Sequence, residues 1–320
     1  MNDVVHRGKV EAVTSTEANE YTKCLENRYK IDSNNEGTAI NRHPTCRGLK
    51  TLSEIMNTME LPCNYVHDGF YLKDSNVVLN EIYLTLVDMF DKKNSTQADK
   101  LIPLVVEVGG HDGITKSISL KASQCLKANT LLVEASPLNY NILKKSRAYD
   151  STVNAALCED DYANLVDNPM NSGETKTFDK THQQKQQTTR VPCTTLDNEI
   201  DHMKISLPLE YEIVLIFLVL DIEGNEPTAI KGMNKYIPKK AMIETKHAGE
   251  GPNPVEEWAK KYNLIGKDCG SDECFNFTPG SFSSDEDYWH PRVFYGARKS
   301  IPTNTYKTSE QSKSYMHYGK

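Results

Sequence analysis

Acidic residues and glycines follow three apolar runs of the sequence, and the first run carries the clearest pattern. Residues 101–108 are apolar apart from Glu107 and Pro103, and a short β-branched run of this kind predicts a buried central strand of a parallel sheet. Three glycines come directly afterwards, at positions Gly109, Gly110 and Gly113. They predict a tight turn in which the backbone approaches a ligand closely. Apolar residues at helical intervals over 114–128 complete a strand, glycine turn and helix, the arrangement with which α/β proteins bind nucleotides.

The spacing within this motif separates two kinds of cofactor. A nicotinamide-binding turn would read Gly-x-Gly-x-x-Gly, whereas this chain reads Glu-x-Gly-x-x-x-Gly over Glu107, Gly109 and Gly113. S-adenosylmethionine carries a sulfonium and an amino group and no pyrophosphate. An acid beside the turn therefore suits it and would repel a diphosphate. The spacing favours S-adenosylmethionine, and a nicotinamide dinucleotide is the alternative.

A second apolar run, residues 130–133, ends in Glu134. An acid at the tip of the second strand, about 20 residues after the glycine turn, can accept hydrogen bonds from both ribose hydroxyls of a nucleoside. The other interpretation is that Glu134 caps the helix that begins near Pro137, and the two roles can coexist. Residues 152–157 predict a third strand, and the loop that follows it is expected to lie along the adenine.

The third run, residues 213–220, is followed by Asp221, Glu223 and Glu226. Ligands bind at the carboxyl ends of the strands in an open parallel sheet. Asp221 and Glu223 alternate in direction, so one can face the cofactor while the other faces the substrate. Capping of a helix over 227–232 is the alternative, and Glu226 fits it best.

An alcohol is a poor nucleophile at neutral pH, so a site that transfers a group to a hydroxyl needs a base. Four residues at or just after the ends of predicted strands are candidates for this base: Asp221, Glu223, Glu244 and His247. His247 has a suitable intrinsic pKa, although a histidine at a strand end is more often structural. A divalent metal held by Asp221, Glu223 and a substrate diol is a further interpretation that no spacing proves.

Composition limits the classes of function. The chain has 320 residues, 38% of them hydrophobic and 25% charged, with a net charge of −7 and a pI near 5.8. This balance, without a basic stripe, argues against sequence-independent binding of nucleic acid. The longest apolar run, residues 213–220, is too short to span a membrane, and the first ten residues lack the core of a signal peptide. Compartment stays open between the cytoplasm and, with an anchor outside this chain, the secretory lumen.

The eight cysteines allow two pairings by position. Cys46 could pair with Cys63, and Cys269 with Cys274. Three others, which lie in or near predicted core elements, are expected to be buried small hydrophobic residues; they are Cys125, Cys158 and Cys193. A zinc site is the weaker interpretation, since no further ligand pair completes a set.

Several blocks of the chain resemble the FkbM-type S-adenosylmethionine-dependent methyltransferases. The blocks are Val-Val-Glu-Val-Gly-Gly-His-Asp-Gly (105–113), Leu-Val-Glu-Ala-Ser-Pro (132–137), Asn-Ala-Ala-Leu (154–157), Val-Pro-Cys-Thr-Thr-Leu-Asp (191–197), Leu-Asp-Ile-Glu-Gly-Asn-Glu (220–226), Ile-Lys-Gly (230–232) and Ala-Met-Ile-Glu (241–244). They stand in the family's order and cover roughly residues 101–245. Glu107 is a departure, because the family more often has Asp there.

The resemblance implies an α/β fold of class I methyltransferase (Rossmann-like) type, with a seven-stranded mostly parallel sheet and helices on both faces. It also implies methyl transfer from S-adenosyl-L-methionine, usually to a hydroxyl of a sugar, glycan or natural product. Glu107, Gly109 and Gly113 would frame the methionine part of the cofactor, and Glu134 the ribose. The residues expected at the cofactor are Glu107, Gly109, Gly110, His111, Asp112, Gly113, Glu134, Ala135, Ser136, Ala155 and Asp221, and those expected to do the chemistry are Asp221, Glu223 and His247.

The remaining segments are expected to surround this domain. The expected divisions are a flexible polar arm over 1–45, a helical extension over 46–100, the methyltransferase domain over 101–299 and a flexible tail over 300–320. A polar insertion over 159–190 is expected to be an edge hairpin or a mobile loop. Two other classes of function stay open beside the transferase, a nicotinamide-dependent oxidoreductase and a catalytically silent cofactor-binding protein.

Overall fold

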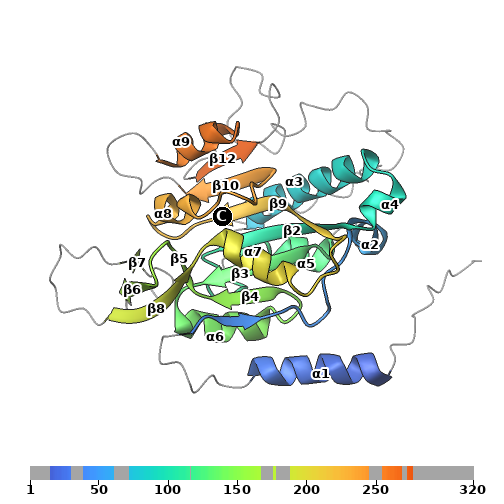
Figure 1. The fold of residues 1–320 in the computed structure, drawn as a ribbon, viewed down its shortest axis with the longest axis horizontal. Helices are drawn as coiled ribbons and strands as arrows, with labels where there is room; N and C mark the ends of the chain where they lie inside the picture. Colours follow the sequence, from blue (N-terminus) through green and yellow to red (C-terminus); the bar gives the residue numbers. More distant parts are fainter. Residues whose placement is uncertain are drawn as a thin grey trace, which may run out of the picture. The chain divides into compact units, whose positions relative to one another are not determined.

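The main sheet has eight strands in the order β1-β4-β3-β2-β9-β10-β12-β11 (Figure 1). The computed structural model describes residues 15–29, 39–60, 72–115, 117–166, 176–177, 188–244, 254–268 and 272–276, all within one unit, residues 1–279. The strands are β1 (Asn41–His43), β2 (Leu101–Val108), β3 (Asn129–Glu134), β4 (Ser151–Asn154), β9 (Glu212–Leu220), β10 (Lys240–Glu244), β11 (Ile265–Asp268) and β12 (Asp272–Asn276).

The five central strands are parallel, and the chain reverses its direction of travel across the sheet between β2 and β9. From β2 the chain adds β3 and then β4 on one side; it returns to place β9 and β10 on the other. All eight residues of β2 are buried, as expected for a strand covered on both faces. A reversal of this kind is a topological switch point, outside which open α/β sheets bind their ligands.

The expected count of seven strands is wrong for this sheet, because β1 adds an eighth. Asn41–His43 pairs antiparallel with β4 at the edge. On the opposite side, β12 pairs antiparallel with both β10 and β11.

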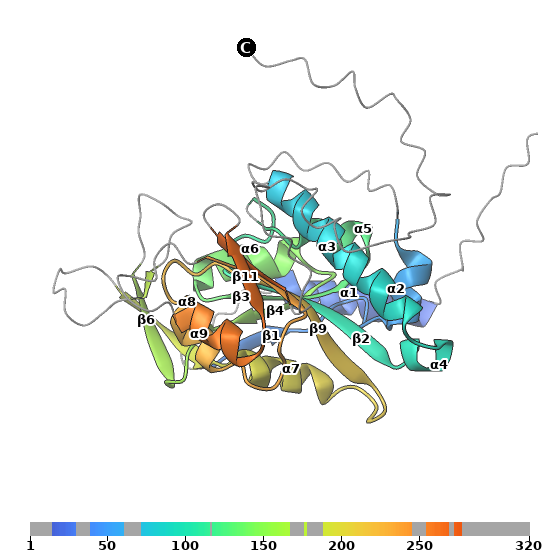
Figure 2. The ribbon, with the colours of Figure 1, turned by 90° about the horizontal axis from the view of Figure 1, so that it is seen from above.

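Helices cover both faces of the sheet (Figure 2). One face packs against α2 (Leu52–Thr58), α3 (Leu72–Asp91), α5 (Leu120–Cys125) and α6 (Pro137–Ser146), and the other against α7 (Leu196–Lys204), α8 (Glu226–Lys231) and α9 (Pro254–Lys261). Neighbouring residues of β3 show the alternation: Leu132 packs on α6, whereas Leu131 and Val133 belong to the opposite layer. The described residues also form α1 (Ser15–Tyr29), which packs on α6, and the short helix α4 (Ser95–Ala98).

A second, four-stranded sheet has the order β5-β8-β6-β7. Its strands are β5 (Ala156–Leu157), β6 (Tyr162–Val166), β7 (Lys176–Thr177) and β8 (Thr188–Thr194). The expected third strand, 152–157, is thus divided, with β4 in the main sheet and β5 in the small one. The described part of the polar insertion, 159–190, contributes an antiparallel pair, β6 and β8.

Two other expectations differ from the structure. The helix expected over 114–128 begins only at Leu120, because the preceding residues bond to Glu107 as described below. Within the stretch expected to be a flexible arm, residues 15–29 form helix α1 and residues 41–43 form β1. Residues 1–14 and 300–320 lie outside the described residues.

The cysteine expectations are wrong in two places. Cys46 is bonded to Cys24 and not to Cys63, and Cys158 is bonded to Cys193. Cys125 is also in a disulfide. Adjacent segments of the fold bring these sulfurs together, with Cα atoms 5.7 and 5.3 Å apart in the two named bonds, a separation typical of disulfides. Cys63 and Cys269 lie outside the described residues.

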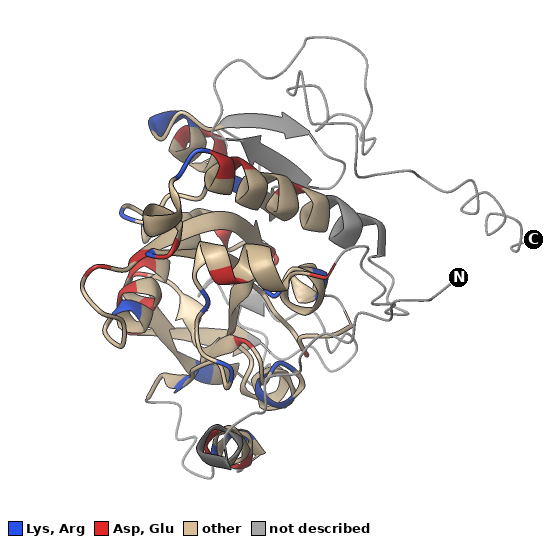
Figure 3. Cartoon of the chain, turned by 90° about the vertical axis from the view of Figure 1, so that its right-hand side faces the viewer, with Lys and Arg blue, Asp and Glu red and all other residues tan. Residues whose placement is uncertain are grey.

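The described surface carries charges of both signs. Basic and acidic residues are interspersed over the described elements (Figure 3). Among the helices that the structure describes, none combines the length and apolar character needed to cross a membrane.

Candidate functional site

The turn after β2 is fixed to the strands on both sides of it. The backbone N–H groups of Gly109 and Gly110 both donate to the carbonyl oxygen of Val133 in β3, at 2.9 and 3.2 Å. Gly109 has a φ of +86°, and a Cβ at this position would overlap the carbonyl oxygen of Asp221 at the end of β9. Glycine is therefore required at position 109 by the close approach of two strand ends.

The other end of the turn lies on helix α6. Gly113 has a φ of +76°, and a Cβ there would come within 2.6 Å of side-chain atoms of Leu143 and Arg147. Ser146 Oγ donates to the carbonyl oxygen of Asp112 at 2.6 Å, and Arg147 Nη1 donates to that of Gly113 at 3.0 Å. The second positive-φ glycine thus lets the turn pack directly on the last turn of α6.

The carboxylate of Glu107 is occupied by the loop between β2 and α5. It accepts hydrogen bonds from Ser117 Oγ, the N–H of Ile118, and both the N–H and Oγ of Ser119, at 2.6 to 3.3 Å. Its side chain is buried, with 3% of the residue exposed. A carboxylate with four donors has little capacity left for a ligand. All four hydrogen bonds of Glu107 go to its own loop, so its role in the structure is to hold that loop in shape. They do not direct the carboxylate toward the methionine part of a cofactor.

Two polar residues stand in the turn itself. His111 has a φ of +47°, and its Nδ1 lies 3.5 Å from Asp112 Oδ1. Asp112 Oδ1 accepts hydrogen bonds from the N–H groups of Ile114 and Thr115 at 2.8 and 2.7 Å, and Oδ2 from the Thr115 hydroxyl. Partial burial raises the pKa of Asp112, but these hydrogen bonds outweigh burial and hold it below its usual value. Asp112 is therefore a charged cap of the following bend.

Glu134 ends β3 with a buried carboxylate that faces the turn. Oε2 accepts from the N–H of His111 and Oε1 from the N–H of Ser136, each at 2.8 Å. Burial raises the pKa of Glu134 to about 7, although these hydrogen bonds oppose the rise. The side chain of Asn139 is a third hydrogen-bond partner of Glu134. Because a carboxylate offers about four acceptor positions, one remains for a further donor such as a ribose hydroxyl.

The neighbours of Glu134 hold its backbone. Asn154 Nδ2 donates to the carbonyl oxygens of Glu134 and Ala135, at 2.8 and 3.0 Å. Ser136 caps α6, with its Oγ accepting from the N–H of Asn139, and Ala155 is buried beside β4. The sequence analysis did not identify Asn154 as a residue that supports the site. Its position at the end of the strand next to Glu134 could have indicated this role.

Three carboxylates meet at the ends of β9 and β10. Asp221, Glu223 and Glu244 each offer an oxygen atom, and these atoms lie within 4.8 Å of one another. Asp221 is exposed, Glu223 is half-buried and Glu244 is buried. Such a set can accept a proton from a hydroxyl group or hold a divalent cation through oxygen ligands.

Glu226 shapes the loop that carries these acids. Its buried carboxylate accepts from the N–H groups of Ile222 and Gly224, at 2.8 and 3.0 Å. Burial raises its pKa, against the pull of the backbone donors. Glu226 stands in the first turn of α8, as the capping interpretation expects, but its carboxylate bonds the loop before the helix. Glu223 is held with a φ of +57° between the two donors.

The strand order brings most of the expected residues to one end of the sheet. Because β2 lies between β3 and β9, the turn at 109–113 stands between Glu134 on one side and Asp221 on the other. The exception is Glu107, whose side chain points into its own loop. His247 lies outside the described residues.

Comparison with known proteins adds a family. The model of the methyltransferase FkbM domain matches residues 107–272. No curated protein matches the chain. Among solved structures, a human methyltransferase 10 domain containing protein is 13% identical, with 63% of this chain and 82% of that chain covered and a TM-score of 0.31. An O-methyltransferase from Bacillus cereus in complex with SAH is 12% identical, with 69% and 99% covered and a TM-score of 0.28.

Proposed function

The chain belongs to the FkbM methyltransferase family, whose domain model matches more than half of it, and from this premise we propose that it transfers a methyl group from S-adenosylmethionine to a hydroxyl of a sugar, glycan or natural product. One observation carries the proposal for the cofactor. The turn at 109–113 stands at the topological switch point, flanked by Glu134 and Asp221 at the ends of the neighbouring strands. Nucleotide-like ligands bind at that place in open α/β sheets.

The residues present fit such a cofactor. Glu134 is buried at a strand tip and keeps an acceptor position beside its bonds to His111, Ser136 and Asn139, where a ribose hydroxyl can donate. Gly109, Gly110, His111, Asp112 and Gly113 would line the part of the cofactor beyond the ribose, with Ala135, Ser136 and Ala155 beside the nucleoside. In this proposal Glu107 holds the loop in shape and does not touch the cofactor.

S-adenosylmethionine, when bound, supplies an electrophilic methyl group on its sulfonium. The chain must align an acceptor hydroxyl with this group and remove its proton. Asp221 and Glu223 are the proposed proton acceptors because they are the more accessible members of the acidic set, and Glu244 supports them from β10. His247, which follows β10 in the sequence, stays a candidate for the same role.

Turnover with a methyl-labelled cofactor tests the proposal. The protein is incubated with labelled S-adenosylmethionine and a panel of glycans, small alcohols, amines and thiols, and transferred label is measured. Asp221→Asn should slow transfer at least a hundredfold, whereas Glu210→Gln, a change at an exposed glutamate in the loop before β9, should leave the rate unchanged. Absence of transfer to every hydroxyl acceptor, with label moving instead to an amine or thiol, would refute O-methylation.

The family match favours methyl transfer over the nicotinamide-dependent alternative. A silent cofactor-binding protein would bind the cofactor in the same place, so only the turnover assay separates it from an enzyme.

The disulfides bear on the compartment. Cys24–Cys46, Cys158–Cys193 and a further bond at Cys125 occur in the described part of the chain, and such bonds persist in oxidising compartments. We therefore propose that the protein works in the secretory pathway or outside the cell. Mass spectrometry of the protein alkylated directly in the cells that produce it should find these cysteines blocked; free thiols at all of them would place it in a reducing compartment.

A further inference from the structure

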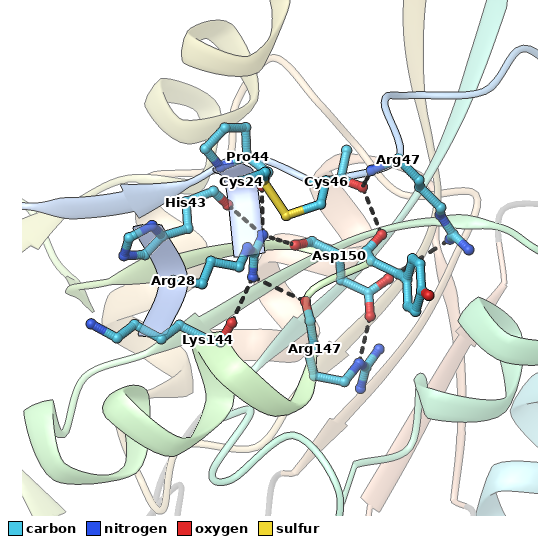
Figure 4. The surroundings of a disulfide bond; sticks show 11 residues. Cys24, Arg28, His43, Pro44, Cys46, Arg47, Lys144, Arg147 and Asp150 are labelled. Atoms are coloured by element: carbon cyan, nitrogen blue, oxygen red, sulfur yellow. Dashed lines mark hydrogen bonds and ion pairs between the residues drawn. A yellow bond between two sulfur atoms is a disulfide. The ribbon is translucent and has the colours of Figure 1, made fainter. Parts of the chain in front are cut away.

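The last turn of α6 is closed by an arginine from α1 (Figure 4). Arg28 Nη1 donates to the carbonyl oxygens of Lys144 and Arg147, at 2.9 and 3.1 Å. Arg28 Nη2 donates to that of Asp150 at 2.5 Å. The last carbonyl groups of a helix have no partner within the helix. Arg28, which is 1% exposed, supplies these partners from a segment more than a hundred residues away in the sequence.

The same guanidinium joins α6 to the segment that carries β1. Arg28 Nη2 also donates to the carbonyl oxygens of His43 and Pro44, at 3.2 and 2.5 Å. Cys24, one helical turn before Arg28, forms a disulfide with Cys46. The backbone N–H of Cys46 donates to the carbonyl oxygen of Ala148 at 3.0 Å. The disulfide therefore fixes α1 at the point where Arg28 enters the end of α6.

The end of α6 holds the glycine turn on its other side. The side chain of Arg147, also 1% exposed, donates through Nη1 to the carbonyl oxygen of Gly113 at 3.0 Å and to Ser117 Oγ at 2.6 Å. Its Nε donates to Asp150 Oδ2 at 2.5 Å. The backbone of Arg147 is thus held by α1 while its side chain holds the turn.

We propose that α1 is a positioning element of the cofactor site, which acts through the Cys24–Cys46 disulfide, Arg28 and the end of α6 to hold the turn at 109–113 in its binding shape. The inference rests on the proposed function, because it assigns the turn to a cofactor. Without α1, the carbonyl groups of Lys144 and Asp150 lose the donor that Arg28 supplies, and that of Arg147 keeps the N–H of Asp150. The end of α6 then frays, and the contact of Arg147 with Gly113 is lost with it.

A set of substitutions tests this inference in the full chain. Arg28→Met removes the five hydrogen bonds and keeps the length of the side chain; Lys23→Met makes the same kind of change at an exposed position of α1 and is the matched control. Cys24→Ser/Cys46→Ser removes the disulfide and leaves Arg28 in place. Arg28→Lys keeps the charge and is expected to be intermediate. The probe is S-adenosylhomocysteine, measured by calorimetry on protein shown to be folded by its thermal transition.

We expect Arg28→Met and the double serine variant to raise the Kd for S-adenosylhomocysteine by about tenfold. Substitutions that act on a distant site typically change affinity by about this much. The loss should fall on the KM for the cofactor more than on kcat, because α1 touches no reacting group. Lys23→Met should bind as the wild type does.

The outcomes separate the inference from its premise. A wild type that does not bind S-adenosylhomocysteine refutes the proposed function. A wild type that binds, together with folded Arg28→Met and double serine variants of unchanged Kd, refutes the positioning role alone. If Arg28→Met does not fold, the double serine variant and Arg28→Lys decide: unchanged Kd and KM in both overturn the inference.

Discussion

Replacement of Glu134 by glutamine should remove the pH dependence of cofactor binding. Burial raises the pKa of this carboxyl from 4.5 to about 7. The carboxylate can accept a hydrogen bond from a ribose hydroxyl at its remaining position, whereas its protonated form cannot, so binding requires that the proton leave. Below pH 7 the Kd for S-adenosylhomocysteine should therefore rise about tenfold for each pH unit, and between pH 8 and pH 6 by about tenfold in total.

The same pKa shift predicts that the free protein becomes less stable as pH rises, although cofactor binding becomes stronger. The folded pKa of Glu134 lies above its unfolded value, so the folded protein binds the extra proton, and the stability contributed at low pH is lost as pH rises through the window from 4.5 to 7. The loss amounts to about 3 kcal/mol in the free protein. Glu134→Gln carries no proton to lose, so its free energy of unfolding should vary less across that window.

Calorimetry at pH 6, 7 and 8 measures the binding, and a repeat in buffers of different ionisation enthalpy measures the proton released. Glutamine keeps one acceptor oxygen where Glu134 bonds two backbone N–H groups. The variant should therefore bind about tenfold more weakly at pH 8 and show a flat pH profile. Glu210→Gln is the control and should keep the wild-type slope. A wild type whose Kd does not change with pH, or a Glu134→Gln variant that keeps the slope, would refute the assignment of Glu134 to the ribose.

Three further predictions concern the turn and the acidic set. Gly109→Ala should destabilise the protein by about 2 kcal/mol or more, because the new Cβ would overlap the carbonyl oxygen of Asp221 and the residue has a φ of +86°. Gly110→Ala should cost less, because its Cβ would meet its nearest neighbours at 3.4 Å. Thermal unfolding that ranks the two variants the other way contradicts the packing argument. Asp221→Asn should lower kcat at least a hundredfold and leave binding of S-adenosylhomocysteine within about twofold, as measured by turnover and calorimetry; full activity removes Asp221 from the chemistry. If the oxygen atoms of Asp221, Glu223 and Glu244 hold a cation, treatment with EDTA should abolish turnover and added Mg²⁺ restore it, whereas unchanged turnover after complete chelation leaves these carboxylates with the proton transfer alone.

The parallel strands could be predicted because burial on both faces leaves a simple mark on the sequence. Residues 101–108 and 213–220 are almost wholly apolar, and β2 and β9 follow them closely. The acids at the strand ends were predictable for the same reason, since Glu134 and Asp221 interrupt runs that otherwise stay apolar. The family blocks gave these strands their order.

The contacts between distant segments could not be predicted. Ile114 and Ile118 have helical spacing, yet α5 begins at Leu120, because Glu107 takes up the backbone N–H groups of Ile118 and Ser119. Periodicity describes a segment by itself and contains no information on such a partner.

The N-terminal segment was missed for a similar reason. Its polar composition hides a buried arginine, because the acceptors of Arg28 are backbone carbonyl groups, which leave no trace in residue types. The partner of Cys46 was equally hidden, since eight cysteines allow many connectivities and sequence alone does not choose among them.

Titration of the full chain with S-adenosylhomocysteine at pH 8 tests the central claim most directly, with NADH titrated in parallel. The account predicts binding in the micromolar range, about −8 kcal/mol, with a rise in the thermal transition, and no binding of NADH. No heat and no thermal shift with S-adenosylhomocysteine would contradict it.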